Sequence, residues 1–156
     1  MLKIKQYLNS NFCLECKECC KFEDDIWLPH LLKADEKALG IACVKARKGS
    51  DSSLICKFLE ETEHKCRVYE RRPFECALYP FLLVRRNGDL DLVVHLGCPY
   101  ILNNVNTQEF EQYSAYLCQA LLEPDNFKLY SQEQAKFHSY PDVELFMIKK
   151  NLLASR

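Results

Sequence analysis

The sequence has few glycines, no long apolar run and almost no net charge. Its four glycines form no Gly-rich turn between a strand and a helix, so a nucleotide-phosphate loop is not expected. Twenty-one Lys and Arg residues against 22 Asp and Glu give a net charge of -1, which creates no field that attracts nucleic acid. No segment approaches the about 20 apolar residues of a membrane span. Nucleic-acid and membrane partners are therefore not expected.

The N-terminal residues include lysines but no apolar stretch long enough for a secretory signal. We therefore expect a cytoplasmic protein, and this changes how its ten cysteines are interpreted. Outside the cell they would indicate disulfides, whereas in a reducing cytosol they indicate metal ligands or redox groups. A disulfide-bonded structural protein would require export.

The length and the hydrophobic content predict one domain. At 156 residues with 48% hydrophobic residues, the chain has enough material for one sizeable core. We expect a small, cysteine-rich α+β domain over residues 1–156, stabilised by metal, with central β-hairpins and surrounding helices. Residues 13–99 would form the metal-binding core and residues 105–156 a helical C-terminal part.

Two hairpins are expected in the middle of the chain. Residues 54–59 and 65–69 are short β-prone runs around a polar segment, and each run carries a cysteine. Residues 81–96 contain two apolar runs on either side of Asn87-Gly88, a pair that suits a tight hairpin turn because it tolerates positive φ.

Helices are expected on both sides of these hairpins. The leucine spacing in residues 28–43 predicts a helix that ends at Gly40. From Thr107, a possible cap, the apolar stripe through Leu121 is typical of an amphipathic helix. A last helix is expected over residues 141–153. The opening residues are expected to be a short helix or arm that turns its apolar side chains toward the core.

The strongest chemical signal is a cluster of four cysteines in eight residues, Cys13, Cys16, Cys19 and Cys20, in the segment CLECKECC. Two-residue gaps let successive sulfurs converge on one centre. If the segment is helical, Cys13, Cys16 and Cys20 share one face, whereas Cys19 is turned by about 100° from Cys20. One metal centre is therefore not expected to use all four.

Four further candidate ligands are Cys56, Cys66, Cys76 and Cys98. Cys76 lies between two prolines and Cys98 precedes Pro99, so these turns can be set at low entropic cost. Eight thiolates would satisfy either two four-sulfur zinc centres or one four-iron (4Fe-4S) cluster with spare cysteines.

Other side chains are weaker candidates. Cys43 and Cys118 are interpreted as packed or surface thiols, and the four histidines as packed or surface residues. Arg71 and Arg72 are candidates to bind loop carbonyls or to offset thiolate charge, although two solvated arginines are equally expected. Thiol-redox catalysis by Cys13 and Cys16 is disfavoured by the further cysteines around them.

The cysteine region resembles the YkgJ-type cysteine-cluster proteins, the CxxCxxCC family of zinc- or iron-chelating domains. The resemblance rests on CLECKECC at residues 13–20, CKFL at 56–59 and CRVYERRPFECALYPF at 66–81, with Cys98-Pro99 as the later cysteine. It implies metal chelation. Distant relatives include flagellin lysine methylases, which carry an iron–sulfur cluster and act with S-adenosylmethionine. An iron–sulfur-dependent, methylase-like methyltransferase is therefore the alternative function, with no catalytic residue identified.

Overall fold

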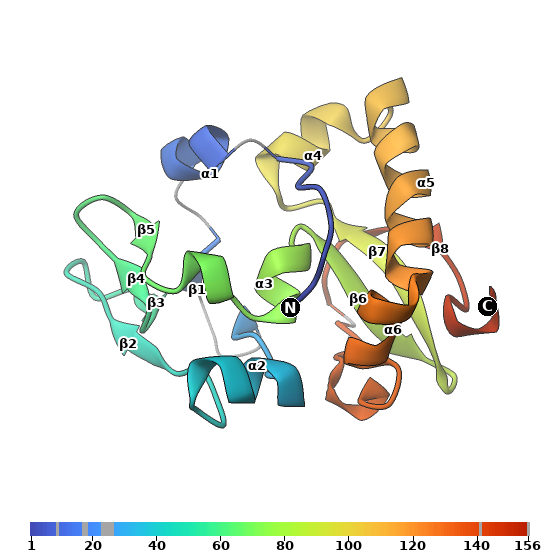
Figure 1. Ribbon diagram of the computed structural model, residues 1–156. Coiled ribbons are helices and arrows are strands. Elements are labelled where there is room, and N and C mark those ends of the chain that lie inside the picture. The colour runs from blue at the N-terminus through green and yellow to red at the C-terminus, as the bar shows by residue number, and fades with distance from the viewer. Residues whose placement is uncertain (9, 17–18, 23–26, 141, 156) are drawn as a thin grey trace.

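The computed structural model describes residues 1–156 except 9, 17–18, 23–26, 141 and 156. The chain contains both helices and antiparallel sheets, and the predicted α+β class is confirmed (Figure 1). The helices are α1 (Ser10–Cys16), α2 (Lys33–Leu39), α3 (Phe74–Leu78), α4 (Pro99–Asn104), α5 (Gln108–Leu122) and α6 (Pro124–Tyr130). The strands are β1 (Lys21–Phe22), β2 (Ala46–Lys48), β3 (Leu54–Cys56), β4 (Leu59–Glu60), β5 (Lys65–Cys66), β6 (Phe81–Arg86), β7 (Asp89–His95) and β8 (Leu145–Lys149). Short 3-10 turns are η2 (Tyr69–Arg71), η3 (Gln134–Lys136) and η4 (Leu153–Ser155).

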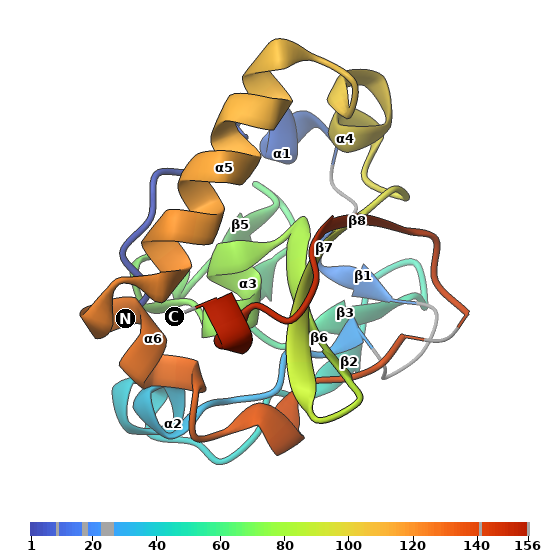
Figure 2. The same cartoon turned by 90° about the vertical axis from the view of Figure 1, so that its right-hand side faces the viewer.

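The largest sheet is built on the predicted hairpin of β6 and β7 (Figure 2). Asn87 and Gly88 form its turn with φ of 49° and 84°, which confirms the prediction from the Asn-Gly pair. Alternate residues point to opposite faces: Leu83 joins the main core, whereas Val84 packs with the aromatic residues on the other face. Because both faces are covered, β7 is apolar and buried over most of its length.

The predicted last helix is wrong in its described part. Residues 145–149 form β8, which pairs antiparallel with β7 through Val93↔Met147 and Val94↔Phe146, and the chain then turns into η4. Pro141, the expected first residue of that helix, lies outside the described residues. The exposed edge of β7 offers a row of backbone partners, and this non-local pairing outweighs the local helical pattern.

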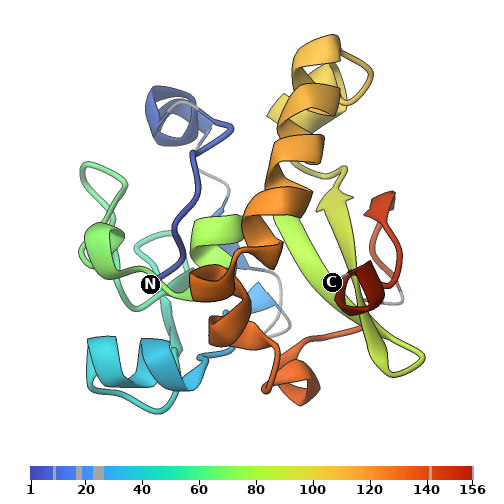
Figure 3. The same cartoon turned by 45° about the vertical axis from the view of Figure 1, so that its right-hand side comes forward.

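Helix α5 covers the main face of this sheet (Figure 3). The Thr107 hydroxyl accepts a hydrogen bond from the N–H of Phe110 at 3.2 Å, so the predicted cap is confirmed. Phe110, Leu117 and Leu121 form its buried stripe, as expected. No helix in the described part of the chain is both long and apolar enough to cross a membrane.

The N-terminal arm lies along α5 and α6. The N–H of Lys3 donates to Asn126 Oδ1 at 2.8 Å, and the N–H of Lys5 donates to the Tyr116 hydroxyl at 2.8 Å. The apolar side chains of the arm pack against the main core, as predicted; they are Leu2, Ile4, Tyr7 and Leu8. The arm thus brings the start of α1, and with it the cysteine cluster, to a fixed place beside the core.

Two small sheets carry the middle of the chain. The first has the order β1-β3-β2, and the second contains only β4 and β5 within the described residues. The predicted hairpin between residues 54–59 and 65–69 is correct only near its tip, where Leu59 pairs with Cys66. Cys56 instead lies on β3, between β1 and β2. The two cysteines therefore come from two separate sheets.

Two short helices meet at one buried carboxylate. Helix α2 is shorter than the predicted 28–43 but ends, as expected, at Gly40 with φ of 68°. Helix α3 was not predicted. The Asp35 carboxylate accepts hydrogen bonds from the N–H groups of Leu32, at 3.0 Å, and of Phe74, at 3.2 Å, and thereby joins the start of α2 to the start of α3. Its side chain is buried, so both N–H groups depend on it.

We expect Asp35→Ala to lower the free energy of unfolding by roughly 1–3 kcal/mol, because two backbone N–H groups lose their acceptor. Urea denaturation of the purified protein measures this change. The matched control is Asp125→Ala, which removes an exposed carboxylate paired with Lys3 and should change the free energy by less than about 0.5 kcal/mol. Equal losses in both variants would contradict the role assigned to Asp35.

Candidate metal centre

The structure divides the eight candidate cysteines into two neighbouring groups. The first thiol group consists of Cys13, Cys16, Cys19 and Cys98. The second thiol group consists of Cys20, Cys56, Cys66 and Cys76. The cluster at residues 13–20 therefore supplies both groups, and they separate at the peptide bond between Cys19 and Cys20.

The first thiol group is built from α1 and from the turn before α4. Cys13 and Cys16 are one helical turn apart on α1, so their side chains share a face. Cys98 occupies the N-cap of α4, where Pro99 takes the first helical position. Together with Cys19 these thiols line a cavity of about 20 Å³. A space of this size is large enough for one water molecule or one ion.

Two thiols of the first group, Cys13 and Cys19, are in direct contact. Cys13 and Cys19 form a side-chain hydrogen bond, which lowers the pKa of Cys13 to about 7 and raises the pKa of Cys19. The positive charge of Arg72 also lowers the pKa of Cys13. The lowered pKa favours the thiolate at Cys13, and the thiolate is the form that binds metal.

The second thiol group joins four elements of the middle segment. The N–H of Cys56 on β3 donates to the carbonyl of Cys20 at 3.0 Å, which ties the end of the cysteine cluster to the first small sheet. Cys66 lies on β5, and Cys76 lies in α3. Burial, followed by the charges of Cys56 and Cys66, raises the pKa of Cys20 to about 12.

Backbone N–H groups act on one sulfur in each group. Those of Phe58 and Leu59 lower the pKa of Cys56, and those of Tyr100 and Ile101 lower the pKa of Cys98, in both cases against a larger rise caused by burial. The Cys98 side chain forms no capping hydrogen bond. The lowering of the Cys98 pKa therefore comes from the dipoles of the Tyr100 and Ile101 N–H groups, which point toward the sulfur. Such dipoles favour the thiolate.

An aromatic wall closes one side of the first thiol group. The Tyr79 ring lines the cavity, and its hydroxyl lies 3.0 Å from Nδ1 of His95. Trp27 stacks on His95 with ring centroids 4.7 Å apart. Gly97 lies so close to the imidazole that a Cβ there would be 2.6 Å from His95 Nε2. Burial, followed by the charge of the nearby thiols, raises the pKa of Tyr79 and keeps its hydroxyl protonated.

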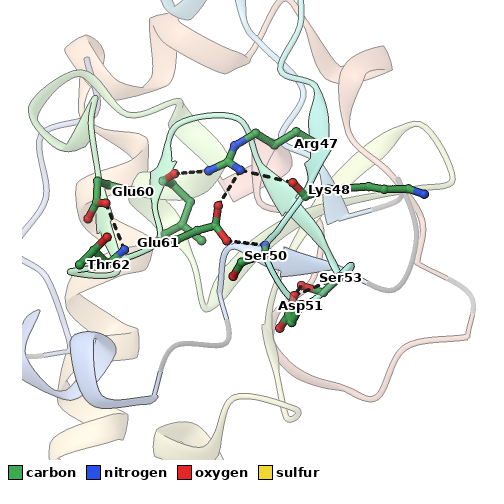
Figure 4. Close-up of polar contacts among 9 residues, drawn as sticks. Arg47, Lys48, Ser50, Asp51, Ser53, Glu60, Glu61 and Thr62 are labelled. Atoms are coloured by element: carbon green, nitrogen blue, oxygen red, sulfur yellow. Dashed lines mark hydrogen bonds and ion pairs between the residues drawn. The ribbon is translucent and has the colours of Figure 1, made fainter.

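A polar clamp holds together the two small sheets that carry Cys56 and Cys66 (Figure 4). Glu61, next to β4, accepts hydrogen bonds from Arg47 Nη1 and from the N–H of Ser50, each at 2.7 Å. Arg47 also donates from Nη2 to the carbonyl of Leu59 at 2.9 Å. The clamp therefore fixes the β2–β3 turn against β4.

The comparisons with known proteins give one family match. Residues 12–119 match the family model of CxxCxxCC, described as "Putative zinc- or iron-chelating domain". The chain belongs to this family. No curated protein and no solved structure matches the chain. The family description supports metal binding in general, leaves open zinc or iron, and assigns neither ligands nor a reaction.

The CxxCxxCC match is longer than the resemblance read from the sequence, which ended near Cys98. It continues through α4 and most of α5.

The structure also places the weaker candidates. Cys118, on α5, is half-buried against the main core, and Cys43 is exposed. Arg71 donates to the carbonyl of Ala38 at 3.2 Å, one of the two roles predicted for the arginine pair.

Sequence reasoning missed two side-chain pairs that the fold brings together. His30 and His138, far apart in the chain, lie with ring centroids 4.1 Å apart beside Glu75. Tyr79 and His95 are likewise brought together by the fold. The sequence carries no local signal for either pair, since the contacts join separate elements.

The donor set fits the metals that the family description names. Soft thiolates suit zinc and iron, and both groups contain four of them. Among the described residues, no three His, Cys, Asp or Glu side chains already stand at the spacing needed to hold an ion. Metal binding therefore requires deprotonation of the thiols and closure of the sulfurs around the ion.

We expect Gly97→Ala to lower the free energy of unfolding by roughly 1–3 kcal/mol, because the new methyl group forces the His95 ring away from Tyr79. The control is the same substitution in a His95→Ala background, where the clash is gone and the additional cost should fall below about 0.5 kcal/mol. Urea denaturation of the four proteins completes this double-mutant cycle. An equal cost in both backgrounds would show that His95 does not set the requirement for glycine.

Proposed function

We propose that this CxxCxxCC domain is a cytoplasmic metal-binding protein that holds single metal ions, zinc first among them, through its clustered cysteine thiolates. The observation that carries the proposal is the cavity of the first thiol group, which is lined by Cys13, Cys16, Cys19 and Cys98. Four sulfurs around a small cavity are the donor set of a tetrahedral structural zinc site.

The size of the cavity favours one ion over a cluster. At about 20 Å³ it accepts a single ion. A four-iron cluster also carries inorganic sulfides and holds its four cysteines further apart, so it would need a larger space. The aromatic wall of Tyr79 and the neighbouring Phe12 limits expansion of the cavity on its inner side.

The charges around the cavity also suit a tetrathiolate ion. Four thiolates around a divalent ion leave a net charge of about −2, which is costly in a partly buried site. The Arg72 guanidinium acts on Cys13 and offsets part of this charge. Tyr79, which stays protonated, adds no further negative charge.

The role supported by these features is structural chelation. An ion shared by α1 and the start of α4 ties the N-terminal cluster to the sheet, and its binding free energy then adds to the stability of the fold. Free thiols in such numbers require a reducing compartment, which is the reason for proposing the cytoplasm. The cluster-dependent methyltransferase remains an outcome of the test, because no described feature favours it over chelation.

We expect Cys16→Ser to weaken zinc binding at least tenfold, since loss of a direct ligand should cost no less than the roughly tenfold loss caused by removing an outer partner. The control is Cys118→Ser, which changes a thiol packed against the core and should retain the wild-type zinc content. Elemental analysis and competition with a chelator on anaerobically purified protein measure both effects.

The same samples distinguish zinc from a cluster. Stoichiometric zinc without acid-labile sulfide supports the proposal. Iron with matching sulfide would overturn the single-ion proposal and favour the enzyme alternative, whereas equal zinc retention in Cys16→Ser and Cys118→Ser would remove Cys16 from the ligand set.

A further inference from the structure

Two pairs of aromatic rings join the segment before α2 to the segment before β8. His30 contacts His138 with ring centroids 4.1 Å apart, and Trp27 stacks on Tyr140 with ring centroids 5.5 Å apart. We call these two ring pairs the aromatic latch. The segment before β8 also covers the edge of β6, because the His138 carbonyl accepts a hydrogen bond from the Arg85 N–H at 3.1 Å.

The two histidines of the aromatic latch lie where protons are costly to add. Nδ1 of His30 and Nε2 of His138 are buried and have no hydrogen-bond partner among the described residues. A neutral imidazole can leave one of its nitrogens without a proton, whereas a protonated ring needs an acceptor for both. Two protonated rings at this separation would also repel each other.

Electrostatic effects at the two rings act in the same direction. Burial lowers the pKa of His30 and of His138, and the charges of His138 and Lys136 lower the pKa of His30 further. The Tyr140 ring lies 5.3 Å from that of His138, and burial raises the pKa of its hydroxyl, so it adds no negative charge. Both rings are therefore neutral while the latch is closed.

The carboxylates near the pair can offset one proton at most. Glu75, on α3, has Oε2 3.9 Å from His30 Nδ1, beyond hydrogen-bond distance, and this oxygen already accepts the His30 backbone N–H at 2.7 Å. Glu36 and Glu133 pair with the Lys136 ammonium at 2.9 and 3.1 Å instead. A second proton on the histidine pair thus meets no compensating charge among the described residues.

We infer that the aromatic latch is a pH-sensitive switch, closed while His30 and His138 are neutral and opened when both rings are protonated. Opening separates Tyr140 from Trp27 and frees the edge of β6. Because Trp27 also stacks on His95, an open latch removes the outer support of the aromatic wall beside the first thiol group. The inference goes beyond the proposed function and does not depend on which metal is bound.

The direction of the pH dependence follows from the lowered pKa values of the two histidines. In the open state both imidazoles titrate near their usual value of about 6.5, whereas in the closed state they take up protons only at lower pH. The open state binds more protons, so the closed latch is most stable above about pH 6.5 and weakens as the pH falls. A pKa lowered by one unit corresponds to a change of about tenfold in the opening equilibrium.

Hydrogen exchange of single amides, measured by NMR on the full chain at about pH 7.5 and about pH 5.5, tests the inference. Protection of the Arg85 N–H should fall on acidification at least about tenfold more in the wild type than in His138→Gln, which has one titrating ring fewer. The control His64→Asn removes a histidine from the β4–β5 turn, where asparagine tolerates the φ of 54°, and should behave as the wild type. Equal losses in the wild type and His138→Gln would overturn the inference.

A measurement on the wild type covers the case in which His138→Gln fails to fold. NMR titration of the imidazoles should show His30 and His138 taking up protons as the Arg85 N–H loses protection. Proton uptake by both rings with Arg85 still protected would overturn the switch. A loss of protection that occurs only in zinc-loaded protein would assign it to protonation of the thiols, which overturns the switch and leaves the proposed function intact.

Discussion

The cost of ionising thiols that are buried and crowded together is the constraint on which the cysteine-rich part of the molecule depends. Eight cysteines converge in two groups, and each group becomes more costly as its members ionise. The surrounding elements are too short to hold such groups together by themselves: β1, β4 and β5 contain two residues each, and α1 contains seven. A bound divalent ion makes ionisation of the thiols favourable, because each thiolate then gains an attraction to the metal.

The part of the molecule built on β6, β7 and α5 is stabilised by hydrophobic packing. Helix α5 packs its apolar stripe on β6 and β7, and the N-terminal arm covers the edge of the same core. Aromatic rings extend this packing toward the cysteines, since Trp27 stacks on both His95 and Tyr140. The rigid sheet thus offers a fixed wall, through Tyr79, against which the first thiol group is placed. We therefore expect metal removal to loosen the cysteine-rich half more than the sheet.

Local signals in the sequence predicted local features well. The Asn87-Gly88 turn and the Thr107 cap depend on backbone preferences within a few residues, and both are confirmed. The failure at β8 has a non-local cause, because its partner β7 is distant in the chain. The eight cysteines could be picked out from their spacing and neighbouring prolines, yet their division into two groups could not. That division depends on the pairing of β3 with β1. The predicted hairpin paired the β3 residues with residues 65–69 instead. Organisation of residues 1–156 as one domain stays a prediction.

X-ray absorption at the zinc edge of the zinc-loaded protein tests the central claim most directly, because it reports the atoms bound to the metal without altering the chain. The account predicts four sulfur ligands per ion at about 2.3 Å, with no nitrogen or oxygen ligand and no second metal at short range. A mixed shell with nitrogen or oxygen, or fewer sulfurs, would contradict tetrathiolate binding by the first thiol group.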